Sequence, residues 1–182
     1  LDKLLELKQS DTPPRCLVLE GRGEAFSAGG DMRIMNKFQN EPESVDEPAR
    51  TMEESTNRII LELARFPSPT VASISGLAVG AGASLAIACD LQLASQAASI
   101  GFLFRRVGLS LDAGSSYFLP RLVGLNVAKE LVYTGEIVEA SRAKDLGLFN
   151  HVYDSDEFSD QVYQTAKNLA NGPTVALRHS KR

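Results

Sequence analysis

Residues 69–90, PTVASISGLAVGAGASLAIACD, contain a strand-to-helix junction that is rich in glycine and alanine. Residues 70–74 are apolar and β-branched enough to predict a strand, and the small residues 81–89 predict a closely packed helix. The glycines between them, in SGLAVGAG, predict a turn. At such a junction the first N–H groups of the helix have no intrahelical partner, and the helix dipole lies behind them. The junction could receive an anion or a developing oxyanion, although an ordinary tight turn has the same composition.

A second junction of the same composition lies earlier in the chain. Residues 26–31, FSAGGD, follow a predicted strand at residues 15–20 and lead into a helix. Here too the small residues leave backbone N–H groups accessible at the start of a helix. Neither loop matches a Walker A or GxGxxG pattern, so a mononucleotide phosphate site is not expected.

The remaining periodicity alternates between strands and helices, which predicts an α/β architecture with crossover connections. No internal repeat or linker divides the chain, so we expect residues 1–182 to form a single domain. The expected strands are residues 15–20, 70–74, 91–94, 99–102 and 149–153. The expected helices are residues 1–11, 56–65, 81–89, 114–122, 126–134, 140–146 and 156–170.

The segment 39–55 differs from the rest of the chain because it is acidic and contains proline. This composition predicts a mobile loop or lid, with part of a helix behind it. The sequence also begins within an amphipathic segment and ends without a terminating signal. We therefore expect it to be a piece of a longer protein.

Composition narrows the classes of partner. The net charge of −4 argues against nucleic acid or an anionic membrane as the main partner. The sequence has no apolar run of about 18 residues and no signal peptide, which favours a cytoplasmic protein. Cys16 and Cys89 lie in apolar runs and are expected to be buried free thiols. His151 and His179 do not show metal-ligand spacing, so we expect no metal site.

Asp112 is the single charge in residues 107–120, VGLSLDAGSSYFLP. Desolvating a carboxylate among apolar residues is costly unless it is compensated. Asp112 could cap the helix predicted to follow it. It could instead be a general acid or base in an apolar pocket. The local sequence leaves both interpretations open.

Four ordered motifs together resemble the enoyl-CoA hydratase/isomerase, or crotonase, superfamily. They are AFSAGGDM, PTVASISGLAVGAGASLAIACD, GLSLDAGSSYFLPRLVG and ELVYTGEIVEASRAKDLGLFNHVYD. The resemblance implies stacked ββα units, with N- and C-terminal parts of the family chain missing here. It also implies a homotrimer or a dimer of trimers. The implied ligand is an acyl-CoA thioester, in which coenzyme A is part of the substrate, and no separate cofactor is expected.

The resemblance also assigns roles to residues of the two junctions. It implies that the N–H groups of Gly30 and Ala81 hold the thioester oxygen, where such donors stabilise a developing enolate. Coenzyme A is expected to contact the neighbouring residues Ala28, Gly29, Asp31, Met32 and Arg33.

The hydratases of this superfamily resemble one another in carrying two glutamates that hold a water. By register these positions are Ser84 and Phe104 here, and neither side chain can deprotonate water. Asp112 instead matches the aspartate of the enoyl-CoA and epoxyphenylacetyl-CoA isomerases. We therefore predict an acyl-CoA isomerase with Gly30, Ala81 and Asp112 as its catalytic residues. The alternatives are an enoyl-CoA hydratase and an acyl-CoA-binding protein with little or no catalysis.

Two further points stay open. The turn around Asp112 is similar to that of 4-chlorobenzoyl-CoA dehalogenases, but the helix predicted at residues 56–65 lacks the histidine those enzymes use. Arg105 and Arg106 could line the pocket, pair with a neighbouring subunit or face water.

Overall fold

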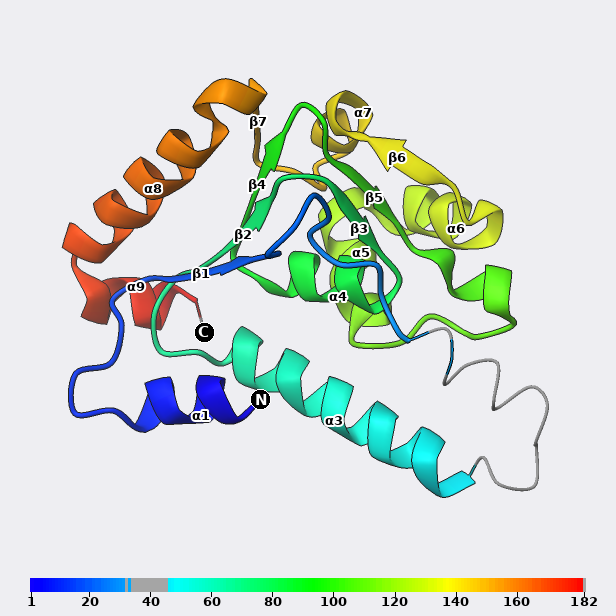
Figure 1. The fold of residues 1–182 in the computed structure, drawn as a ribbon, viewed down its shortest axis with the longest axis horizontal. Coiled ribbons are helices and arrows are strands. Elements are labelled where there is room, and N and C mark those ends of the chain that lie inside the picture. Colours follow the sequence, from blue (N-terminus) through cyan, green and yellow to red (C-terminus); the bar gives the residue numbers. More distant parts are fainter. Residues whose placement is uncertain (32, 34–45, 182) are drawn as a thin grey trace.

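A four-stranded parallel sheet runs through the centre of the protein, as the computed structural model shows (Figure 1). The structure describes residues 1–31, 33 and 46–181, without the side chains of residues 46–50, 52 and 53. The sheet has the order β1-β2-β4-β7. Its strands are β1 (Leu17–Glu20), β2 (Thr70–Ile74), β4 (Leu91–Ser95) and β7 (His151–Tyr153). Because every neighbouring pair is parallel, a crossover connects each strand to the next.

A second, three-stranded sheet lies beside the first and has the order β3-β5-β6. Its strands are β3 (Leu77–Val79), β5 (Ser99–Gly101) and β6 (Ile137–Glu139). The chain passes from β2 in the first sheet to β3 in the second and then into helix α4 (Ala81–Ala88). It repeats this path through β4 and β5 into the 3₁₀ helix η2 (Leu103–Val107). Each unit therefore contributes one strand to each sheet, which confirms the expected stack of ββα units.

Helices cover both faces of the parallel sheet (Figure 1). Helix α8 (Ser155–Asn171) covers one face, where Phe158 and Val162 pack against Val71 and Leu93. The larger apolar core lies on the other face and includes α4. The remaining helices are α1 (Asp2–Gln9), α3 (Asp46–Ala64), α5 (Ser115–Val123), α6 (Leu125–Thr134), α7 (Ala140–Asp145) and α9 (Thr174–Ser180).

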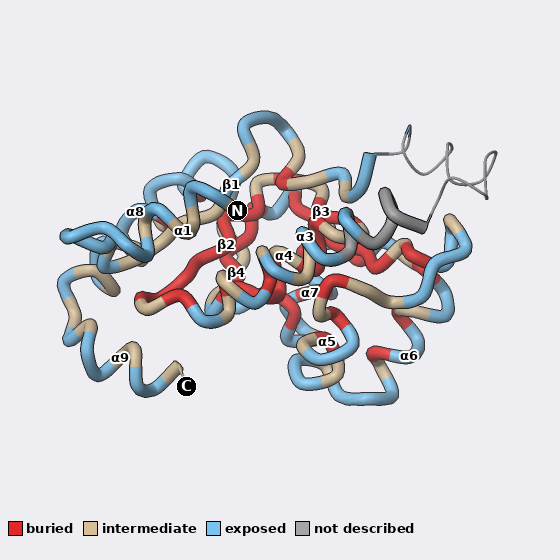
Figure 2. The backbone as a smooth tube through the Cα atoms, turned by 90° about the horizontal axis from the view of Figure 1, so that it is seen from below, coloured by how far each residue is buried: buried red, intermediate tan, exposed pale blue. Residues whose placement is uncertain are grey.

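Strand β2 and helix α4, which flank residues 75–80, are both largely buried. All five residues of β2 are buried, as expected for a strand with parallel neighbours on both sides. Most of α4 is also buried, and its alanines and glycine let it lie close to the sheets. Figure 2 shows this buried interior between outer helices that are largely exposed.

Some of the sequence predictions are wrong in detail. Residues 46–55, predicted as part of a mobile loop, form the first half of α3, and residues 39–45 of that prediction lie outside the described residues. Pro48 did not break the helix because it lies in the first turn, where no intrahelical N–H donor is required. The predicted turn at residues 75–82 contains strand β3. Strand β6 and helix α9 are absent from the elements that the sequence predicts.

Candidate functional site

The two glycine-rich loops meet because the segment after β1 runs beside β3. Ser27 N donates to Leu77 O at 3.1 Å, and Val79 N donates to Ser27 O at 3.0 Å. These bonds form an isolated parallel bridge between Ser27 and Ala78. The residues that follow Ser27 therefore lie beside the residues that follow Ala78.

Gly29 brings the two backbones into direct contact. Its φ of +87° is unfavourable for a residue with a side chain. A Cβ atom on Gly29 would lie 2.8 Å from the carbonyl oxygen of Val79 and 3.7 Å from the amide nitrogen of Ala81. Only glycine fits this approach. It places Gly30 next to the start of α4.

The amides of Gly30 and Ala81 have no acceptor within the described part of the chain. Ala81 is the first residue of α4, and the helix offers no carbonyl to its N–H group. Both residues line the same cavity. The structure thus brings together the two residues that the sequence predicts as main-chain donors, and leaves their N–H groups available.

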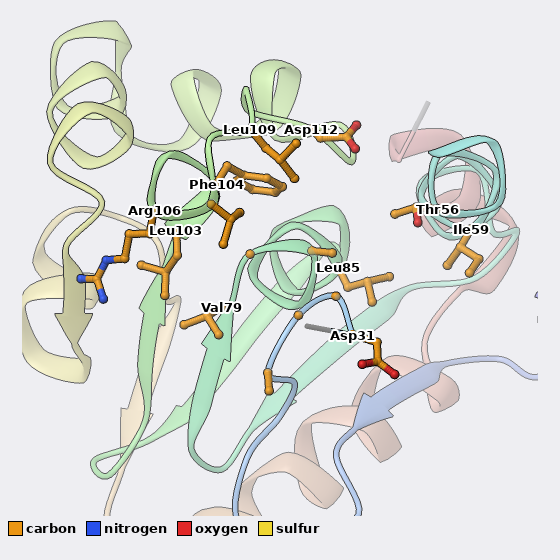
Figure 3. Close-up of a pocket in the computed structure, with 16 residues that line it drawn as sticks. Asp31, Thr56, Ile59, Val79, Leu85, Leu103, Phe104, Arg106, Leu109 and Asp112 are labelled. Atoms are coloured by element: carbon orange, nitrogen blue, oxygen red, sulfur yellow. The ribbon is translucent and has the colours of Figure 1, made fainter. Parts of the chain in front are cut away.

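The cavity has a volume of about 530 Å³, which suits a small-molecule ligand. Its walls come from the two loops, from α3 and α4, and from the segment of η2 and the turn after it (Figure 3). Most lining side chains are apolar. The lining residues are Ala28, Gly29, Gly30, Asp31, Thr56, Ile59, Val79, Gly80, Ala81, Leu85, Leu103, Phe104, Arg106, Val107, Leu109 and Asp112.

Asp112 is half-buried and lines this cavity. It does not cap α5, so that interpretation of the sequence is wrong. The N-cap of α5 is Gly114, with no side-chain cap. The left-handed conformations of Ala113 (φ 52°) and Gly114 (φ 73°) separate Asp112 from the helix. Its carboxylate instead accepts a hydrogen bond from the amide of Ala113.

Ser84 and Phe104, the positions of the two hydratase glutamates by resemblance, are both buried. Phe104 presents its ring to the cavity, while Ser84 is directed away from the cavity lining and toward α5. Asp31 and Asp112 are the acidic residues of the described lining. Figure 3 shows them on opposite sides of the cavity, Asp31 on the first glycine loop and Asp112 on the turn before α5.

Asp31 forms an ion pair with Arg33, with Arg33 Nη2 at 2.7 Å from Asp31 Oδ2. The side-chain hydrogen bonds from Arg33, together with the bond from its backbone N–H, lower the pKa of Asp31 from 3.8 to about 2. The Arg33 side chain is 91% exposed and does not line the described cavity. Of the residues predicted to contact coenzyme A, Ala28, Gly29 and Asp31 line the cavity, and Met32 lies outside the described residues.

Arg105 and Arg106 both bind the end of helix α6. Arg105 Nη1 donates to Thr134 O at 3.1 Å, and Arg106 Nε donates to Gly135 O at 3.0 Å. The two cations thus satisfy carbonyls at the negative end of a helix dipole. Arg106 also contributes to the cavity lining. Arg106 therefore lines the pocket, which is one of the three possibilities that the sequence leaves open, and both arginines are exposed.

The two cysteines are free, as predicted, with Cys89 buried and Cys16 half-buried. Burial, and secondarily the charge of Asp90, raises the pKa of Cys16 to about 11 and that of Cys89 to about 12. In the described part of the chain no three His, Cys, Asp or Glu side chains gather as metal ligands. No helix among the described residues is long and apolar enough to cross a membrane.

Comparison with known proteins assigns the chain to a family. A family model described as enoyl-CoA hydratase/isomerase matches residues 1–182. The chain belongs to the enoyl-CoA hydratase/isomerase family.

Relatives of this family carry both isomerase and hydratase names. Enoyl-CoA isomerase/hydratase fer4 of Mycosarcoma maydis is 33% identical over 180 residues, which are 98% of this chain and 64% of the relative. The 1,2-epoxyphenylacetyl-CoA isomerase of Escherichia coli K12 is 32% identical over 177 residues, 97% of this chain and 67% of the relative. The crystal structure of an enoyl-CoA hydratase from Bacillus anthracis superposes with a TM-score of 0.88 at 30% identity, covering 99% of this chain and 67% of that one.

The chain spans about two thirds of the length of these enoyl-CoA hydratase/isomerase relatives. Sequence reasoning identified the two loops and Asp112 but did not identify most of the apolar cavity wall. Thr56, Ile59, Leu85, Leu103 and Leu109 come from three separate segments. No local motif marks them, because their meeting depends on how α3, α4 and η2 pack together.

Proposed function

We propose that this protein is an acyl-CoA isomerase in which Gly30 and Ala81 bind the thioester oxygen and Asp112 transfers a proton. The observation that carries the proposal is the meeting of two main-chain amides that lack acceptors within the described residues, in a cavity that also contains a half-buried carboxylate. These groups supply the two functions that enolate chemistry needs, a place for the negative charge and a group for the proton.

In the proposed reaction the Asp112 carboxylate removes a proton from a carbon of an enoyl-CoA. The electron pair of that C–H bond forms a new C=C bond, and the negative charge moves onto the thioester oxygen. The amides of Gly30 and Ala81 donate hydrogen bonds to this oxygen, which lowers the energy of the enolate. The protonated Asp112 then returns its proton two carbons away, so the double bond has moved and the enzyme is regenerated.

The isomerase proposal is favoured over hydration by the side chains at two positions. A hydratase of the kind the resemblance implies needs two carboxylates to hold and deprotonate a water. Here Ser84 is buried against α5 and Phe104 contributes a phenyl ring. A single carboxylate is sufficient for an isomerase, because the same group removes and returns the proton.

Two other functions have specific support. Hydratase names among the relatives support enoyl-CoA hydration as the second candidate. The residues at positions 84 and 104 support the third candidate, a protein that binds acyl-CoA with little catalysis. A homotrimer or dimer of trimers and a cytoplasmic location remain predictions for the whole protein.

Proton exchange separates these three functions. The full-length protein is incubated with an enoyl-CoA in deuterated water, and deuterium in the acyl chain is followed by mass spectrometry. We expect exchange and double-bond migration in the wild-type protein, and a loss of both in Asp112→Asn with binding of the thioester retained. Hydration of crotonyl-CoA at a rate that Asp112→Asn does not change would support the hydratase. Binding of enoyl-CoAs without exchange would support the binding protein.

A further inference from the structure

A buried pair of hydroxyl groups connects helix α4 with the start of helix α5. Ser84 Oγ and Ser115 Oγ lie 2.5 Å apart, and neither residue is accessible to solvent. Ser84 Oγ also lies 3.2 Å from Gly80 O and 3.5 Å from Asp112 O. The two buried hydroxyls therefore lie between Gly80, which precedes the proposed donor Ala81, and Asp112, the proposed acid and base.

The hydroxyl protons can be assigned by counting donors and acceptors. Each serine has one proton to donate, and the carbonyl acceptors lie within reach of Ser84. Ser115 therefore donates to Ser84, and Ser84 donates to Gly80 O, with the Asp112 carbonyl as a longer second contact. A bond from a helical serine to the carbonyl four residues earlier is a common arrangement.

The bond to Gly80 acts on the proposed donor directly. The carbonyl of Gly80 and the N–H of Ala81 belong to the same planar peptide group. A hydrogen bond that fixes the direction of the Gly80 carbonyl therefore also fixes the direction of the Ala81 N–H. Gly80 itself has a φ of 55° and a ψ of −126°, a conformation with no side chain to restrict it. The Gly80 carbonyl accepts two hydrogen bonds from Ser84, one from its amide at 3.1 Å and one from its hydroxyl at 3.2 Å. The Ser84 hydroxyl therefore adds a second restraint on this peptide group from inside the protein.

On the other side, Ser115 holds the turn that carries Asp112. Its amide donates to Asp112 O at 3.0 Å, and it is the first residue of α5. The turn between them contains Ala113 and Gly114 in left-handed conformations. Ser115 is thus bonded to the Asp112 turn through its backbone and to Ser84 through its side chain.

We propose that Ser84 is a positioning residue that aligns the Ala81 amide with the Asp112 turn through its bonds to Gly80 and Ser115. This inference rests on the proposed function of Ala81 and Asp112. It also gives a role to the position where the resemblance places a hydratase glutamate. Neither serine lines the described cavity, so their effect on the reaction passes through the two groups that they hold.

The test compares Ser84→Ala, Ser115→Ala and Ser95→Ala in the full-length protein. Ser95 is a matched control, because it is also buried and its hydroxyl lies 3.0 Å from that of Ser155, outside the cavity. We expect Ser84→Ala to lower kcat for proton exchange about tenfold with KM changed less than about twofold. Ser115→Ala leaves the Ser84–Gly80 bond in place and should lower kcat less. Ser95→Ala should change neither constant.

The infrared stretch of the thioester carbonyl in bound butyryl-CoA provides a second readout. A hydrogen bond to this carbonyl lowers its stretching frequency, so a misaligned Ala81 amide should move the band toward its position in water. We expect this shift in Ser84→Ala and no shift in Ser95→Ala. The proposal is overturned if Ser84→Ala and Ser95→Ala show the same kcat and the same carbonyl band.

The two proposals fail in different ways. If the wild-type protein shows no exchange with any enoyl-CoA, the proposed function fails and the role of Ser84 fails with it. If the wild-type protein is active, Asp112→Asn is inactive and Ser84→Ala behaves like the control, only the inference about Ser84 is wrong. Melting temperatures of all variants show whether a loss of kcat reflects unfolding.

Discussion

Lys181 Nζ lies 2.8 Å from the carboxylate of Asp90, and this ion pair joins the end of helix α9 to the central sheet. Asp90 Oδ2 also accepts bonds from the amide and hydroxyl of Thr70 at 2.7 and 2.9 Å. The Lys181 side chain is 10% exposed, so solvent screens the pair less than it screens the other ion pairs of the described chain.

Replacing Lys181 should therefore destabilise the protein more than replacing an exposed lysine. Lys181→Met leaves the Asp90 carboxylate partly buried without its cation, and we expect the free energy of unfolding to fall by about 2 kcal/mol. Lys3→Met is the control, because the Lys3–Glu6 pair is 71% and 68% exposed. It should change stability by less than about 0.5 kcal/mol. Urea unfolding of both variants measures the difference, and equal effects would contradict it.

Gly29→Ala should separate the two glycine loops. The new Cβ would lie 2.8 Å from Val79 O at a φ of +87°, so the backbone must move at the place where the two proposed donors meet. We expect a loss of proton exchange of about 100-fold, the usual effect of one lost donor. Gly23→Ala is the control because nothing lies within 4 Å of the added atom. Exchange rates of the two variants decide the point, and full activity in Gly29→Ala would contradict it.

The two thiols should be unreactive in the folded protein. Their pKa values of about 11 and about 12 leave almost no thiolate at neutral pH, and the thiolate is the reactive form. Titration with a chromogenic disulfide at pH 7.5 should detect neither cysteine within minutes. Both should react at once in denaturant. Rapid labelling of the native protein would show that one of these sites opens.

The carboxyl group of Asp31 should titrate at about pH 2 rather than at 3.8. Because its folded pKa is lower than its unfolded value, the ion pair with Arg33 stabilises the fold above pH 4, and this contribution is lost as the pH falls toward 2. Carbon-13 NMR of the Asp31 carboxyl group measures the titration. Arg33→Gln should return the pKa toward 3.8, and an unchanged pKa in that variant would contradict the role given to Arg33.

Much of the fold follows from local sequence, and the exceptions have physical causes. The sequence predicts strand β2 at its observed bounds because four of its five residues are apolar or β-branched and the strand lies between proline and glycine signals. The sequence does not predict strands β3 and β6, because β3 lies between glycines that indicate a turn and both strands depend on pairing with β5. The start of α3 was missed because an acidic segment with Pro48 has the composition of a loop.

The candidate site also has features that the sequence predicts and features that depend on the folded structure. Gly30, Ala81 and Asp112 carry motif signals, and the structure lines one cavity with all three. The local sequence could not decide whether Asp112 caps α5, because that depends on the backbone conformation of Ala113 and Gly114. The Ser84–Ser115 contact joins residues 31 positions apart, and nothing in either segment indicates the other.

The bridge between Ser27 and Ala78 is the contact of the proposed active site that we expect to open first. It consists of two backbone hydrogen bonds at the margin of the smaller sheet, whereas the parallel sheet has a continuous ladder. Local opening of so few bonds requires much less free energy than global unfolding. A mild denaturant or a distant substitution can therefore inactivate the protein while its circular dichroism spectrum stays native, and amide exchange at Ser27 and Val79 would register that event before any melting curve does.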